Sequence, residues 1–208
     1  MPMQTFFNLP EDKKRTILKA ARQEFSRVPL EQASIAHIIK TANIPRGSFY
    51  QYFQNKEDLY KFMMSNIGNK VFEKIVGYLK ENSGDVIEAS IKLFYYLMDI
   101  ISQDENASFF KNMFLNMNDK MRDSLTQNTE DNHCKHKHFI NLRDLAKYID
   151  TEKLIFKEEK EVLYILRMII GLFYQNLIPY FSGKISQEQA IESYLFQMNL
   201  IRKAIYKG

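Results

Sequence analysis

Apolar residues recur at helical spacing along most of this chain, and short polar breaks separate the helical stretches. Within residues 33–59 the pattern predicts two short helices around a tight corner, with a third helix starting behind them. The first of these has one apolar face, made of Ile35, Ile38, Ile39 and Ala42. Ser34 is a typical N-cap for it, and Asn43 tolerates the positive φ that ends such a helix abruptly. The pattern in this stretch therefore predicts a helix-turn-helix.

The second short helix has two faces of different chemistry. Pro45 presets φ at its start, and Phe49 and Phe53 share its apolar face. Gly47 adds no bulk to the opposite face. That face carries side chains able to reach base edges or phosphates from a major groove: Arg46, Ser48, Tyr50, Gln51 and Tyr52. We interpret this helix as a DNA reader, and an ordinary helical corner with a solvated polar face is the alternative.

The third helix has a clear start signal. Asn55 can cap it, with Asp58 at the spacing of a capping box. Lys56, at the beginning of the helix, can meet a phosphate.

The motifs GSFYQYF (47–53) and NKEDL (55–59) resemble the TetR family of bacterial transcriptional regulators. The resemblance covers about the first 60 residues. Three positions depart from the commonest family pattern, Ile39, Asn43 and Pro45, and none of them removes a DNA-facing group. By this resemblance, Arg46, Ser48 and Gln51 lie nearest the bases. The residues that it implies hold phosphates are Ser34, Tyr50, Tyr52 and Lys56.

The whole pattern predicts an all-α protein with two domains. Residues 1–55 form a three-helix DNA-binding domain, whose first helix runs from Pro10 toward Pro29, and residues 56–208 form a ligand-binding and dimerisation domain. We expect residues 1–8 to be frayed. A long helix from Lys56 to Asn82 begins in the first domain and ends in the second, so it is the predicted mechanical link.

The last two helices predict a homodimer. One of them carries a coiled-coil seam from Leu163 to Tyr180 and a second apolar face, which the single final helix cannot cover. Two copies would pack as a four-helix bundle. The expected interface residues are Leu163, Leu166, Ile170, Phe173, Leu177, Leu195 and Met198.

Aromatic and thioether side chains are concentrated in one short predicted helix, within residues 109–117. Such side chains suit an adaptable pocket for a small apolar inducer, although plain core packing uses the same residues. The candidate pocket wall is Met63, Ile67, Phe94, Met98, Phe110, Met113, Phe114 and Phe173. The inducer would release DNA by favouring a conformation in which the two DNA-binding domains of a dimer are held at the wrong separation for the operator.

One short segment gathers three of the four His and the only Cys. Its possible ligands are His133, Cys134, His136 and His138. They could bind zinc or haem iron as an effector, and Lys135 and Lys137 would suit the carboxylates of haem. A solvated basic loop is the alternative, and no cofactor is otherwise required.

Composition narrows the functional classes further. The 208 residues are 45% hydrophobic and 26% charged, with only 7 Gly and 5 Pro, which indicates a soluble protein with long helices. The net charge of +4 is compatible with a nucleic-acid partner. We expect no membrane span and a cytoplasmic location, because the start lacks an apolar signal segment and no run reaches spanning length.

No phosphate-binding loop, nucleophile elbow or zinc-protease motif occurs, so an enzyme is not expected. The favoured function is a ligand-responsive repressor that binds palindromic, double-stranded operator DNA as a dimer. A haem- or metal-sensing version remains an alternative. So does a helical enzyme or adaptor in which the helix-turn-helix is only structural.

Overall fold

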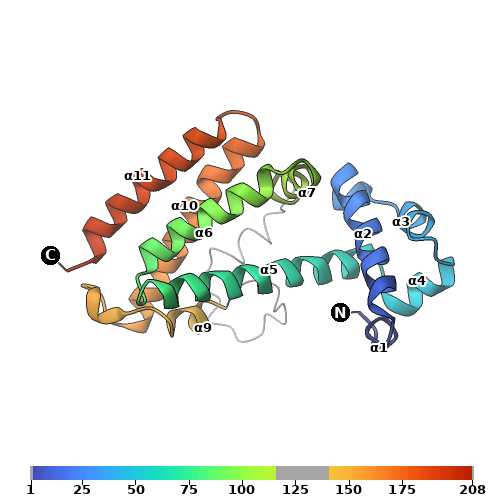
Figure 1. Ribbon diagram of the computed structural model, residues 1–208, viewed down its shortest axis with the longest axis horizontal. Coiled ribbons are helices and arrows are strands. Elements are labelled where there is room, and N and C mark those ends of the chain that lie inside the picture. Colours follow the sequence, from blue (N-terminus) through green and yellow to red (C-terminus); the bar gives the residue numbers. More distant parts are fainter. Residues whose placement is uncertain (1, 116–140, 208) are drawn as a thin grey trace.

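A computed structural model describes residues 2–115 and 141–207 of the chain, and all its longer elements are helices (Figure 1). The N-terminal head contains α1 (Gln4–Phe7), α2 (Glu11–Arg27), η1 (Leu30–Gln32), α3 (Ile35–Thr41) and α4 (Arg46–Tyr52). The remaining elements are α5 (Lys56–Glu81), α6 (Val86–Ser102), α7 (Asp104–Leu115), α9 (Leu142–Ala146), η2 (Thr151–Lys153), α10 (Glu159–Phe181) and α11 (Gln187–Ile205). The all-α prediction is confirmed.

Helix α5 runs from the head into the C-terminal part and lies along α6 (Figure 1). Its start follows the predicted cap, because Asn55 Oδ1 accepts the backbone N–H of Asp58 at 2.8 Å. After its end, Ser83 and Gly84 adopt φ of 52° and 77°, which turns the chain into α6. The predicted bounds of this linking helix, Lys56 to Asn82, agree with the structure to one residue.

Helix α7 makes a second connection between the two parts, packing along α2 of the head. The side-chain amide of Asn112 donates to the carbonyls of Phe25 and Ser26 at 3.0 and 2.9 Å, close to the last turn of α2. Arg22 donates to Asn106 and lies 5.1 Å from the ring centroid of Phe109. The expectation that α5 alone links the domains was therefore incomplete.

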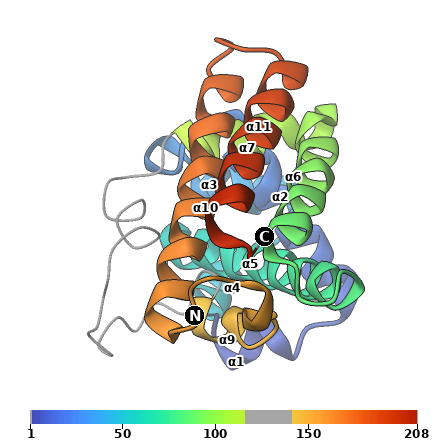
Figure 2. The ribbon, with the colours of Figure 1, turned by 90° about the vertical axis from the view of Figure 1, so that its left-hand side faces the viewer.

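The C-terminal core lies between α6, α10 and α11, and Figure 2 shows α10 and α11 side by side. The rings of Phe94 and Tyr194 stack with centroids 4.0 Å apart. Phe173 meets Phe94 edge-on at 5.4 Å. Aromatic pairs in these geometries add attraction beyond the burial of their area, so they fix the three helices relative to one another.

The end of α11 is tied to the start of α6 by a polar cluster. Arg202 reaches Asp85 at 3.1 Å and Glu88 at 3.2 Å, and the Tyr206 hydroxyl donates to Asp85 at 2.7 Å. Partial burial acts to raise the pKa of Asp85. The Glu88 N–H, the Tyr206 hydroxyl and the Arg202 charge outweigh it and hold that pKa below its usual value.

Helix α10 is 23 residues long and, by length and composition alone, apolar enough to cross a membrane. The expectation that no run reaches spanning length was therefore wrong for this helix. In the structure it packs against α7, α9 and α11. Some of its apolar side chains belong to the protein's own core, since Val162, Leu166 and Leu177 are buried.

Residues 4–7 form a helix, so the expectation of a frayed start was also wrong for these residues. Phe6 is only 1% exposed and packs into the head. The sequence pattern missed this element because it is a single turn, whose stability comes from distant contacts rather than from its own spacing.

Gly84 before α6 and Gly183 after α10 both have positive φ, but we expect their substitution by Ala to reduce stability by different amounts. A Cβ at Gly84 would lie 2.5 Å from the backbone nitrogen of Asp150, whereas a Cβ at Gly183 would meet nothing within 4 Å. Gly183→Ala should cost about 1 kcal/mol of unfolding free energy through backbone strain alone. Gly84→Ala should cost about 2–4 kcal/mol, because the clash adds to that strain. Equal losses in denaturant unfolding of the two variants would contradict the close approach.

Candidate nucleic-acid interface

The corner between α3 and α4 is as short as the sequence predicts. Asn43 has a φ of 50°, and Ile44 is buried behind it with 9% exposure. Pro45 is the N-cap of α4 rather than its first helical residue, with φ −61° and ψ 145°. Asn is one of the few non-glycine residues suited to this turn, so only four residues, 42–45, separate α3 from α4.

Helix α4 has one buried and one exposed face. Phe49 and Phe53 are each 0% exposed and anchor the helix in the head. Tyr50 is 42% exposed and lies edge-on to Phe49 at 5.4 Å. Ser48 is half-buried. The other exposed candidates for DNA contacts on this helix are Arg46, Gly47 and Gln51.

Tyr52 does not belong to the exposed face to which the sequence pattern assigned it. Its side chain is 6% exposed, and its ring tilts against Phe6 with centroids 6.3 Å apart. The assignment failed because Phe6 comes from α1, an element that the sequence pattern did not predict. A phosphate contact by the Tyr52 hydroxyl stays a prediction.

The start of α3 is capped differently from the expectation. Ser34 occupies the N-cap position, but its side chain makes no capping hydrogen bond. Instead, its backbone N–H donates to Glu24 Oε1 at 2.7 Å. The hydroxyl is thus not used by the helix, which is compatible with the predicted phosphate contact.

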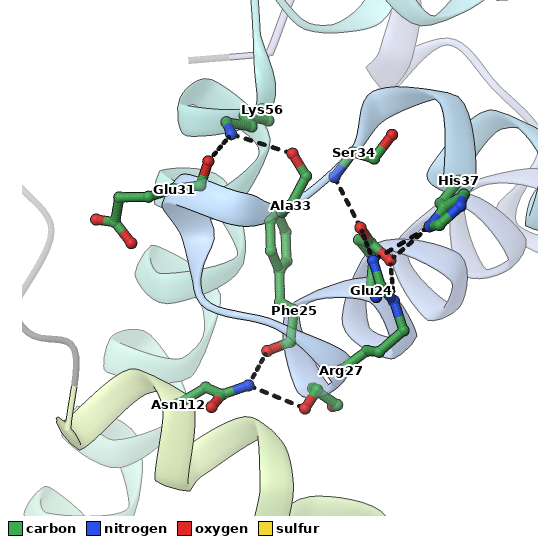
Figure 3. A network of polar contacts seen from close by, with 10 residues as sticks. Glu24, Phe25, Arg27, Glu31, Ala33, Ser34, His37, Lys56 and Asn112 are labelled. Carbon is green, nitrogen blue, oxygen red and sulfur yellow. Dashed lines mark hydrogen bonds and ion pairs between the residues drawn. The ribbon is translucent and has the colours of Figure 1, made fainter.

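Glu24 is the centre of a polar network in the head (Figure 3). It is 5% exposed, and its two carboxylate oxygens accept bonds from Nε and Nη2 of Arg27 at 3.0 and 2.9 Å. The ring Nδ1 of His37 lies 3.4 Å from Glu24 and 3.2 Å from Arg27 Nη2. The Arg27 hydrogen bond, helped by the Ser34 N–H, lowers the pKa of Glu24 although burial acts to raise it.

This network joins α2 to the start of α3 through a buried carboxylate. Sequence reasoning missed this network. His37 is exposed, and its ring Nδ1 faces Glu24. The available signal was Glu24 beside Phe25 on the apolar side of α2, with Arg27 three residues further on. A carboxylate in that position needs partners.

Lys56 ties the start of α5 to the segment before α3. Its ammonium donates to the carbonyls of Glu31 and Ala33 at 2.7 and 3.0 Å (Figure 3). An ammonium has three donors, so one is left for another acceptor. The predicted phosphate contact of Lys56 therefore remains a prediction, to which the structure adds a second role in fixing the head on α5.

The candidate pocket residues come from four helices, α5, α6, α7 and α10. Phe114 stacks on Phe181 at 5.2 Å and lies 5.6 Å from Tyr174, which joins α7 to α10. Ile67, Phe114 and Phe173 are half-buried. The buried members are Met63, Phe94, Met98, Phe110 and Met113. A ligand among them stays a prediction.

The expected dimer residues do not form an exposed face. Leu166, Leu177 and Met198 are 3%, 1% and 0% exposed within a single chain, so they belong to its own core and their assignment to the interface was wrong. The other members are half-buried: Leu163, Ile170, Phe173 and Leu195. Heptad spacing locates an apolar stripe but does not say whether a partner or the same chain covers it.

The cluster of His133, Cys134, His136 and His138 lies outside the described residues. Within residues 2–115 and 141–207, the structure contains no group of three His, Cys, Asp or Glu that could hold a metal.

Two family models match this chain. The one described as "Bacterial regulatory proteins, tetR family" matches residues 17–62, which span most of the head. The one described as "Tetracyclin repressor-like, C-terminal domain" matches residues 85–205, more than half of the chain. The chain belongs to the TetR family. This family consists of regulatory proteins and not enzymes, in agreement with the sequence expectation.

Curated relatives from Bacillus subtilis (strain 168) match over a shorter span. The uncharacterized HTH-type transcriptional regulator YdgC is 36% identical over 72 residues, which are 35% of this chain and 36% of YdgC. The regulator YhgD, also uncharacterized, is 26% identical over 80 residues, 38% of each chain. The chain thus aligns with a little over a third of the length of these relatives.

Solved TetR-family structures share the fold over the whole chain. A putative regulator from Mesorhizobium loti MAFF303099 has a TM-score of 0.62 at 14% identity, covering 94% of this chain and 98% of that one. A regulator from Chloroflexus aurantiacus J-10-FL has a TM-score of 0.52 at 17% identity, with complete coverage of both chains. At such identities the likeness shows the fold alone.

The Glu24 network predicts a specific dependence of stability on pH. A carboxyl whose folded pKa is lowered contributes stability above its unfolded pKa, and loses it as the pH falls through the folded value. Glu24→Gln should therefore cost about 1–3 kcal/mol at pH 7. The difference from wild type should begin to shrink below about pH 4.5, where the carboxyl of the unfolded chain becomes protonated, and it should be lost once the pH falls through the lower pKa of the folded state.

Thermal melting between pH 7 and pH 3 measures this difference. Glu11→Gln is the matched control, because Glu11 pairs with Lys14 on the same helix at the same spacing but is exposed. It should change the melting temperature little. A Glu24 variant that behaves like the Glu11 variant would contradict the role of the buried carboxylate.

Proposed function

We propose that this TetR-family chain is a transcriptional repressor that reads double-stranded operator DNA with α4 in the major groove. The main support for this proposal is that α4 has one buried apolar face and one exposed polar face. Phe49 and Phe53 hold one face in the head, and Arg46 and Gln51 stand exposed on the other. Both side chains can pair with base edges in a major groove, Arg with guanine and Gln with adenine.

The remaining polar groups around α4 suit the sugar-phosphate backbone. Tyr50 is exposed on the same helix, the Ser34 hydroxyl is not used in capping, and Lys56 retains one free donor direction. Contacts of this kind fix the register of a protein on DNA without reading its sequence. These groups lie at the start of α3, in α4 and at the start of α5, so phosphate contacts could fix the head on the DNA on both sides of α4.

The proposed operator-binding form is a homodimer joined through α10 and α11. Two exposed apolar rows support it, on helices that lie side by side (Figure 2). On α11, Phe196 and Leu200 are 66% and 51% exposed and four residues apart. On α10, the exposed residues are Tyr164, Met168 and Ile178. Burying such rows between two copies would form a four-helix bundle and present two α4 helices to a palindromic operator.

A small apolar inducer entering the C-terminal domain would release the DNA. The aromatic core around Phe94 and Phe114 is in contact with α5 and α7, and both of these helices contact the head. A ligand that favours one arrangement of that core can therefore favour one placement of the heads. It shifts the equilibrium only by its difference in affinity for the two states.

Selection of duplexes from a random pool by the purified protein tests the proposed function. The protein should enrich a palindrome whose half-sites are one helical turn apart, about 10 base pairs centre to centre. Failure to enrich any sequence would contradict the proposal. The enriched duplex also serves as the probe for the variants below.

Arg46→Ala and Gln51→Ala should each weaken binding to the selected duplex by about 1–3 kcal/mol and relax the preference at one base pair. Arg143→Ala removes an exposed positive charge on α9, so it is the matched control for Arg46→Ala and should leave the affinity unchanged. Titrations against the selected duplex and its single-base variants measure both effects. Unchanged base preference in both α4 variants would show that α4 is not the reader.

Phe196→Arg should split the dimer, because it places a charge in the middle of the proposed apolar contact. Tyr95→Arg is the matched control, since Tyr95 is another exposed aromatic residue, 46% exposed, on α6. Light scattering at micromolar concentration should give a monomer for the first variant and a dimer for wild type and control. A Phe196 variant that remains dimeric would place the interface elsewhere.

A further inference from the structure

The short helix α1 is attached directly to the end of the proposed reading helix. The backbone N–H of Met3 donates to the carbonyl of Tyr52 at 2.9 Å, and the Thr5 hydroxyl donates to the carbonyl of Gln51. The last four carbonyls of an α-helix have no partner within the helix itself. Two of these four in α4 are therefore satisfied by α1.

The side chain of Phe6 fills the space between α4 and α5. It is 1% exposed, and its ring lies 4.8 Å from Phe53 and 5.4 Å from Phe62, measured between centroids. Phe7 adds a second edge-on contact with Phe62 at 6.0 Å. The segment 3–7 therefore contacts both the reading helix and the helix that leads to the C-terminal domain.

The second half of α4 depends on this contact for its direction. A helix of seven residues is not stable in water by itself, so its orientation is set by what it packs against. Its first half follows the turn at Asn43. Its second half carries Gln51 on one side, and on the other side Tyr52 and the following residue, Phe53, contact Phe6.

We propose that residues 3–7 are a positioning element that sets the direction of α4 for base recognition, with Thr5 and Phe6 as its positioning residues. This proposal rests on the proposed function. Base-edge hydrogen bonds require exact placement of a side chain, whereas contacts with phosphates tolerate small shifts. Loosening α1 should therefore reduce affinity for the selected duplex much more than affinity for unrelated DNA.

The test compares Thr5→Val and Phe6→Ala with Gln4→Ala, a control on the same turn whose exposed side chain bonds only to Asn8. Each protein is titrated against the duplex selected by wild type and against an unrelated duplex of equal length. We expect a loss of about 5- to 10-fold on the selected duplex for both variants, and less than about 2-fold on the unrelated one. The control should match wild type on both.

Thr5→Val removes one hydroxyl and keeps the shape of the side chain, so it keeps the proposal testable if Phe6→Ala destabilises the head. Phe6→Leu should recover part of the preference, because it restores apolar volume next to Phe53. The proposal is overturned if Thr5→Val retains the wild-type ratio of affinities, or if both duplexes weaken equally. If wild type selects no duplex at all, the proposed function fails first, and that outcome is distinct from a failure of α1.

Discussion

The direction of a two-turn helix, α4, is the constraint on which the proposed DNA reading depends. Such a helix cannot hold itself in water, so its anchor must come from packing. Phe49 within α4 and Phe53 directly after its last residue supply that anchor, and both are completely buried. The turn at Asn43 fixes one end of the helix, and α1 meets the other. The rest of the head is arranged around these contacts.

The head is joined to the C-terminal part at two places, and their chemistry differs. At α5, Lys56 holds two carbonyls of the segment before α3. At α7, Asn112 holds two carbonyls at the end of α2. A rearrangement of the aromatic core between α6, α7 and α10 would act on both connections. Two separate attachments constrain rotation of the head more than a single helix would, because they remove the freedom to turn about α5.

The sequence was sufficient for the features that depend on neighbouring residues. The cap at Asn55, the turn at Asn43 and the long α5 were all predicted, because local spacing and backbone preference determine them. The polar face of α4 was predicted except for Tyr52. It was Phe6, distant in the sequence, that buried Tyr52 and ordered α1. The dimer stripe was misplaced for a similar reason, since helical periodicity does not identify which apolar face the chain covers itself.

Reading of one operator by two copies of α4 is tested most directly by the stoichiometry and footprint of the complex with the selected duplex. Light scattering of the purified complex gives the number of chains, and hydroxyl-radical cleavage gives the protected positions. We expect two chains on one duplex, with two protected half-sites whose centres are about 34–36 Å apart along one face of the DNA. One chain per duplex with a single protected site would contradict this expectation.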